Sequence, residues 1–126
     1  MRLPREIART PLLLWFALLG PPLAWTFQHI AGYALTDAAC SGPGATPEFT
    51  VDAWLIVVAA VGVTIALLGE IAAIVMFRRT RDAPEEPPAS RVHFLAVVAM
   101  TIGPLFLAII LMSGLGSILL SACRQS

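Results

Sequence analysis

Few side chains in this chain are able to do chemistry, and those that are lie within or beside long apolar runs. They are two thiols, one acid deep in an apolar run, and an adjacent amide and imidazole, namely Cys40, Cys123, Glu70, Gln28 and His29. Thiols bridge or bind metals, an acid carries a proton, and an imidazole binds metal or haem. No nucleophile elbow, metalloprotease helix, phosphate-binding loop or dinucleotide fingerprint accompanies them. We therefore expect no enzyme, no bound metal and no cofactor.

The elements that carry these residues are apolar runs long enough to cross a membrane. Of the 126 residues, 58% are hydrophobic and 13% are charged, against roughly half and roughly a quarter in a soluble domain. A helix needs roughly 20 apolar residues to cross the hydrocarbon core. The sequence predicts an all-α membrane protein, with one transmembrane domain over 1–126 and three transmembrane helices at about 12–36, 52–77 and 92–122. Its net charge of zero argues against a nucleic-acid partner and leaves the lipid bilayer as the expected environment.

The arginines predict the orientation. Seven of the eight lie in the N-terminal tail or between the second and third runs, and arginine-rich loops stay in the cytoplasm. We expect a multi-pass protein of the bacterial inner membrane, with the N-terminus and loop 78–91 cytoplasmic, and loop 37–51 and the C-terminus periplasmic. A cleaved signal peptide is the alternative reading of the first run. Against it, no small-x-small site follows the first apolar block, and Asp37 spoils a lipoprotein site at Cys40.

This orientation brings the two cysteines to one side of the membrane. Cys40 follows the first span and Cys123 ends the third, and both face an oxidising compartment in which disulfides persist. Neighbouring helix ends can approach within the roughly 4.4–6.8 Å between Cα atoms that a bridge requires. We predict a disulfide between them, with unpaired interfacial thiols and a thiolate metal site as the alternatives.

Glu70 is the one formal charge well inside a span. It lies about seven residues, or roughly 10 Å, from the cytoplasmic end of the second span. At a similar depth, Pro21 and Pro22 deprive the carbonyls of Ala17 and Leu18 of their helical donors, and Thr101 is level with them on the third span. We expect a protonated Glu70 to bond to one of these oxygens as an interhelical contact. A proton or cation site is the functional alternative.

Gln28 and His29 place polar groups in the outer half of the first span, and His29 shares a helical stripe with Trp25 and Tyr33. The other histidine, His93, begins the third span at the opposite side of the membrane, so more than ~20 Å of helix rise separates the two and no haem can bridge them. We expect Gln28 and His29 to bond to a neighbouring helix, with a quinone, lipid head group or metal as alternatives. The sequence names no partner for them within the chain, and His93 is expected to be a solvated helix start.

Small residues recur at helical spacing in every span, together with prolines. Such rows let helix backbones approach closely in lipid, and three helices bury only part of them, which indicates a further partner or self-association. The expected packing residues are Gly20, Pro21, Pro22 and Ala24 in the first span, Gly62, Ala66, Gly69 and Ala73 in the second, and Gly103, Pro104, Ser113 and Ser117 in the third.

Two segments carry a family resemblance. The first segment resembles small uncharacterised three-helix membrane proteins of proteobacteria; it is Leu19 to Trp25, followed by Gln28-His29, Tyr33 and a cysteine just past the span. The second segment is similar to the last helix of those proteins and runs from Gly114-Leu115-Gly116 to Cys123. Members of that group occur beside genes for haem–copper terminal oxidases. The resemblance implies a non-catalytic accessory or assembly subunit of a respiratory complex, with a terminal (cytochrome c) oxidase as the partner. Two other functions stay open from the residues: a small homo-oligomeric transporter or proton channel that uses Glu70, and a membrane redox or ligand sensor that uses Cys40, Cys123 and His29.

Overall fold

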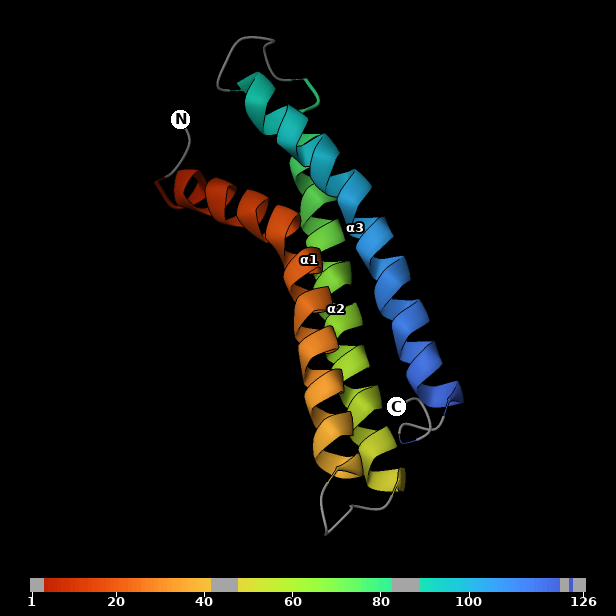
Figure 1. The fold of residues 1–126 in the computed structure, drawn as a ribbon. Coiled ribbons are helices and arrows are strands. Elements are labelled where there is room, and N and C mark those ends of the chain that lie inside the picture. The colour runs from red at the N-terminus through yellow and green to blue at the C-terminus, as the bar shows by residue number, and fades with distance from the viewer. Residues whose placement is uncertain (1–3, 42–47, 83–88, 121–122, 124–126) are drawn as a thin grey trace.

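Three long helices make up the fold. The computed structural model describes residues 4–41, 48–82, 89–120 and 123, with side chains from residue 11 onward except at 48, 49 and 89. The helices are α1 (Pro4–Cys40), α2 (Glu48–Thr80) and α3 (Ala89–Leu119), and each packs against the other two. They run in alternating directions, as Figure 1 shows. The predicted all-α fold with three helices is confirmed.

Each helix has different bounds from the span predicted on it. α1 continues to Cys40 and α2 begins at Glu48, so the predicted loop 37–51 shrinks to the residues between them. α2 continues past Phe77 to Thr80, and two arginines in its last turn favour that extension because they oppose the negative end of the helix dipole. Hydropathy marks where a helix meets the edge of the apolar layer, whereas capping and turn residues mark where it ends.

α1 is bent rather than straight. Its N-terminal part turns away from the other two helices, while the rest runs alongside them (Figure 1). Pro11, Pro21 and Pro22 all lie inside this helix, and each removes a backbone donor and crowds the carbonyl four residues earlier. Prolines are the commonest cause of sharp bends in helices, so we attribute the bend to them.

The core between the helices is thin and consists mostly of alanine and glycine. Ala17, Ala66, Ala73, Ala96 and Ala99 are each fully buried. Side chains of this size let the helix backbones approach closely, which is how helices associate without a hydrophobic driving force. Four small clusters follow one another along the bundle. The one nearest the 41–48 connection joins Ala39, Val51 and Leu55, and the next joins Ala24, Ala66 and Ile110.

The predicted packing rows hold for α1 and α2 and fail in part for α3. Gly20, Pro21, Ala24, Gly62, Ala66, Gly69, Ala73 and Gly103 are buried, and Pro22 is half-buried. Ser113 and Pro104 are exposed, and the Ser117 hydroxyl donates to Ser113 O within its own helix at 3.0 Å. Gly114, one residue after Ser113, faces the bundle instead. Each residue advances the helix by 100°, so the spacing of small residues shows which of them share a face but does not show which face packs inside the bundle.

Two of the three helices are long and apolar enough to cross a membrane by length and composition. Within the described residues these are Thr50–Thr80 and Ser90–Leu119, that is, α2 and α3. α1 is less apolar, because Pro21, Pro22, Gln28 and His29 interrupt its run. Large apolar side chains are exposed on the outside of all three helices, far beyond what a soluble monomer exposes.

Candidate functional site

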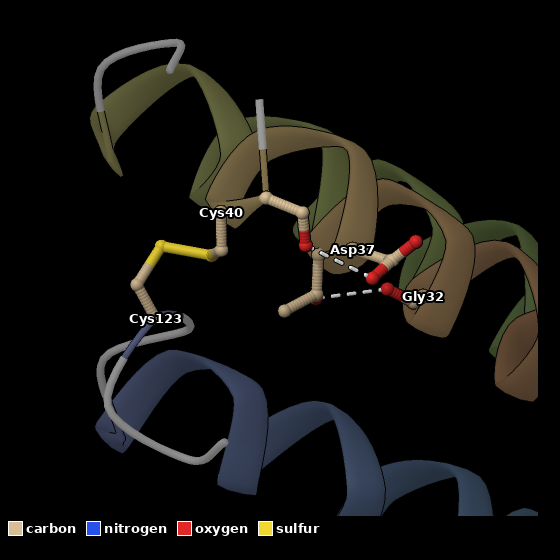
Figure 2. Close-up of a disulfide and its surroundings, with 6 residues drawn as sticks. Gly32, Asp37, Cys40 and Cys123 are labelled. Carbon is tan, nitrogen blue, oxygen red and sulfur yellow. Dashed lines mark hydrogen bonds between the residues drawn. A yellow bond between two sulfur atoms is a disulfide. The ribbon is translucent and has the colours of Figure 1, made fainter. Parts of the chain in front are cut away.

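A disulfide closes the end of the bundle at which α1 ends and α3 finishes, called here the disulfide end. Cys40 and Cys123 are joined with 5.5 Å between their Cα atoms and a sequence separation of 83 (Figure 2). The two cysteines that the predicted topology places on one side thus lie at disulfide distance. Beside them, Ser41 caps α1: its backbone N–H donates to Asp37 O at 3.0 Å and its hydroxyl to Asp37 Oδ1 at 3.1 Å. The bridge ties the end of α1 to the segment after α3.

Gln28 lies inside the bundle, at the point where all three helices meet. Only 6% of its surface is exposed, and its Nε2 donates to Ile110 O on α3 at 3.3 Å. Two glycines flank it at ordinary van der Waals distance: a Cβ on Gly62 would lie 3.8 Å from Gln28 Cβ, and one on Gly114 would lie 3.7 Å from Nε2. The expected bond from Gln28 to a neighbouring helix is confirmed, and the partner that the sequence could not name is a backbone carbonyl of α3. The missing signal was the rotation of α3, which a single sequence does not carry.

One oxygen of the same amide remains unbonded. Gln28 Oε1 is buried and accepts no hydrogen bond from any described residue. A buried acceptor without a donor costs roughly 1–3 kcal/mol. Gln28 therefore holds α1 against α3 through one bond while keeping an unused acceptor in the apolar interior.

Glu70 packs against a glycine of α3. A Cβ on Gly103 would overlap the Glu70 carboxyl oxygen Oε2 and would lie 3.2 Å from Cδ. Oε2 is buried and has no hydrogen-bond partner among the described residues. The expected bond from Glu70 to Ala17 or Leu18 on α1 is therefore wrong, because the side chain points to α3. Only the absence of a side chain at residue 103 lets the acid enter there.

The other residue expected at this depth does not take part. Thr101 is exposed, and its hydroxyl donates to Val97 O at 3.0 Å within α3. Threonine in a helix often satisfies its hydroxyl proton in this way, and no described residue donates a hydrogen bond to the Thr101 oxygen. The prediction of an interhelical contact at Thr101 is wrong.

The prolines of α1 pack onto a glycine of α2. Pro21 is fully buried, and a Cβ on Gly69 would lie 2.9 Å from Pro21 Cδ and 3.1 Å from Pro21 Cγ. The Phe16 carbonyl oxygen is near the same point, at 3.7 Å. This is the closest approach of α1 to α2 at any glycine of the described chain. It is a packing contact, separate from Glu70.

His29 lies on the outside of the bundle. Its ring is exposed and stacks on Trp25, with 5.5 Å between centroids. Neither ring nitrogen bonds to another described residue, so the expected bond to a neighbouring helix is absent within this chain. Tyr33, one turn further, is 76% exposed. α1 thus presents an imidazole and a phenol on its outer surface, among large apolar side chains.

His93 joins α3 to α2 at the opposite end of the bundle, called here the arginine end. Its Nδ1 lies 2.9 Å from Thr80 Oγ1, and its ring stacks on Phe77 with 5.2 Å between centroids. The Thr80 hydroxyl also lies 2.8 Å from Met76 O, and the tautomer of His93 decides which partner donates in the contact between Nδ1 and Thr80. His93 is half-buried; the expectation of a solvated helix start is wrong.

The polar groups do not converge into one catalytic or metal site. Within the described residues no three histidine, cysteine, aspartate or glutamate side chains lie close enough together to hold a metal ion. His29 is eleven residues before Cys40 on the same helix, about 16 Å by helical rise. No protein-family model matches this chain, and no curated protein and no solved structure is detectably similar to it.

Proposed function

We propose that this protein is a non-catalytic, three-span protein of the bacterial inner membrane that packs against a larger membrane complex. The length and apolar character of α2 and α3 support two of the spans. The arginines at the N-terminus and at the arginine end support a cytoplasmic location for both, which leaves the disulfide end in the oxidising periplasm.

The packing of α1 supports its assignment as the third span. Gln28 lowers the hydropathy of α1, yet it is buried against α3 and does not face the surroundings. Pro21 is likewise buried against Gly69. Much of the polarity that makes α1 less apolar is therefore hidden inside the bundle, and the outer surface of the helix is suited to lipid or to another protein.

His29 is the observation that carries the proposal of a partner. An imidazole exposed among apolar side chains, without a hydrogen bond from any described residue, is costly in a bilayer. A neighbouring transmembrane helix that supplies a donor or an acceptor removes that cost. The neighbouring Trp25 and Tyr33 provide the aromatic contact area that is common at protein interfaces.

The resemblance to proteins encoded beside terminal oxidases makes a haem–copper oxidase the partner to test first. The test is affinity purification of the full chain from native membranes in mild detergent, with the haem absorbance of the eluate as the readout. We expect haem to co-purify with the wild type and to fall at least tenfold with His29→Leu. Thr64→Val is the matched control, because it alters an exposed polar residue whose only described bond is to Ala60 O. A lone homo-oligomer without haem in the wild-type eluate contradicts the proposal.

A second function rests on the unpartnered Glu70 oxygen. Glu70 is half-buried, and its buried oxygen Oε2 has no bonding partner among the described residues; an acid within a membrane span is the group that proton channels and exchangers use. A homo-oligomeric channel predicts proton flux in vesicles that Glu70→Gln abolishes. The accessory role predicts no such flux and an assembled complex with either residue.

The sensor function finds less support. Cys40 and Cys123 are joined to each other, and His29 lies about 16 Å away along α1, so the three side chains do not share a site. Carbonate extraction of membranes, before and after reduction, tests whether the disulfide has any role beyond holding the bundle.

A further inference from the structure

The arginine end gathers four basic side chains from two helices. Arg78 and Arg79 lie in the last turn of α2, Arg81 follows that helix, Arg91 lies in the first turn of α3, and all four are exposed. The contact of His93 with Thr80 and Phe77 shows that these two helix ends lie side by side, as Figure 1 also shows. No ion pair joins any of the four to another described residue.

The charge balance of this end is positive. Four arginines against Asp82 leave three net positive charges among the described residues from 78 to 82 and from 90 to 93. Glu85 and Glu86 belong to segment 83–88, outside the described residues, and are not in this sum. Guanidinium groups bind phosphate oxygens through two parallel hydrogen bonds, so a phosphate is the anion that such a cluster fits.

An apolar strip begins beside the cluster. Phe94 follows Arg91 by three residues and is 66% exposed, and Val97 follows by three more and is 41% exposed. Residues at this spacing share one face of a helix. The same face of α3 therefore presents first a cation and then apolar surface that leads toward the middle of the bundle, which is the order in which a phospholipid presents its head group and its acyl chain.

We propose that the arginine end is a binding site for an anionic phospholipid, held in shape by the contact of His93 with Thr80. Arg78, Arg79 and Arg91 bind the phosphate, and the acyl chain follows Phe94 and Val97. The proposal rests on the proposed function, because it requires α2 and α3 to span the membrane. A soluble anion or an acidic protein segment would use the charges and leave the adjoining apolar strip without a role.

The test measures lipid binding to the full chain in mild detergent by native mass spectrometry. Dioleoyl phosphatidylglycerol is the probe, and dioleoyl phosphatidylcholine is the neutral reference. Each cation near an anionic lipid strengthens binding about fivefold, so the variant R78Q/R79Q/R91Q is expected to bind phosphatidylglycerol roughly 100-fold more weakly. The variant R2Q/R5Q/R9Q removes the same number of charges from the N-terminal tail and is expected to bind within a few-fold of wild type. Equal losses in the two variants overturn the site.

A second pair of variants tests whether the shape of the site is required. Thr80→Val keeps every charge and removes the hydroxyl that contacts His93, and we expect a several-fold loss of binding. Thr64→Val removes the same kind of bond to the preceding turn and touches no other helix. If the two threonine variants bind phosphatidylglycerol alike, the contact does not hold a site and the proposal is overturned.

Two further measurements separate the causes of failure. Millimolar glycerol phosphate is expected to leave lipid binding nearly unchanged; if it displaces phosphatidylglycerol completely, the ligand is the phosphate alone. Alkaline carbonate extraction reports on the proposed function. A chain that leaves the membrane refutes the three-span assignment, whereas a retained chain without lipid preference refutes only the lipid site.

Discussion

Replacing Gly69 by alanine tests the closest contact between α1 and α2. The new Cβ would lie 2.9 Å from Pro21 Cδ and 3.1 Å from Cγ, where carbon atoms ordinarily stay about 3.5–4.0 Å apart. The proline ring is rigid and fully buried, so the two helices must separate by about 0.6 Å. Overpacking of this kind costs about 1–3 kcal/mol, and the better helix propensity of alanine offsets about 1 kcal/mol. We expect a net destabilisation of about 1 kcal/mol.

The measurement is unfolding in mixed detergent micelles with increasing dodecyl sulfate, followed by circular dichroism. Gly69→Ala should shift the midpoint to a lower dodecyl sulfate fraction. In a Pro21→Ala background the ring atoms that cause the clash are absent, so the same substitution should be neutral or stabilising. The double-mutant cycle should therefore give a coupling of about 1–2 kcal/mol between the two sites.

Gly116→Ala is the matched control, because a Cβ at that position on α3 meets no atom within 4 Å. It should be neutral or stabilise by up to about 1 kcal/mol through helix propensity. If Gly69→Ala stabilises the chain as much as Gly116→Ala does, α1 and α2 do not touch at Pro21 and the reasoning fails.

Three further predictions use the same unfolding assay. Gly103→Ala should destabilise the protein by about 1 kcal/mol because the new methyl group overlaps the Glu70 carboxyl. In a Glu70→Ala background the same substitution should have no such effect, and an equal loss with and without the Glu70 side chain contradicts the contact. Gln28→Leu should change stability by less than about 1 kcal/mol, since it removes both the bond to α3 and the unsatisfied acceptor, whereas Gln28→Ala should cost more because it also leaves a cavity. A loss well above about 1 kcal/mol with Gln28→Leu would show that the bond dominates. Cys40→Ser should lower the free energy of unfolding by at most about 4.5 kcal/mol, the loop-entropy value for a sequence separation of this length. Cys123→Ser and the reduced wild type should lose the same amount, and a reduced wild type as stable as the oxidised protein refutes a stabilising bridge.

The sequence could predict how far along each helix a residue lies, but it could not predict which way the residue faces. The position of a residue along the bundle axis follows from counting residues from the helix end. The two cysteines could therefore be paired, and Glu70 could be assigned to the same height along the axis as the prolines of α1. The rotation of each helix depends on packing against the other two. Thr101 and Ser113 therefore lie on the wrong face for their predicted contacts, and Gln28 acquires a partner on α3 that no count could name.

The small-residue rows of α1 and α2 were predictable for a different reason. Gly62, Ala66, Gly69 and Ala73 form a single row on α2 with large apolar residues on the other faces, so only one face permits close approach. α3 carries two competing rows, one through Ser113 and Ser117 and one through Gly103 and Gly114. The second row faces inward, where Gly103 has no side chain to meet Glu70 and Gly114 has none to crowd Ala59 of α2.

The positions of Gly103 and Gly114 on α3 have a consequence for biosynthesis. Gly103 and Gly114 lie eleven residues apart, about 16 Å along the helix; Gly103 packs against Glu70 of α2, and Gly114 lies beside Gln28 of α1 and Ala59 of α2. When only α1 and α2 have been made, the Glu70 carboxyl and the Gln28 amide have nothing to cover them. When α3 packs against the first two helices, it covers the Glu70 carboxyl and the Gln28 amide together, and it does so at a single axial position and a single rotation of α3. Cys123 emerges after that helix, so the bridge to Cys40 closes only on a chain whose last helix is already in place, and the oxidised form marks a completed bundle.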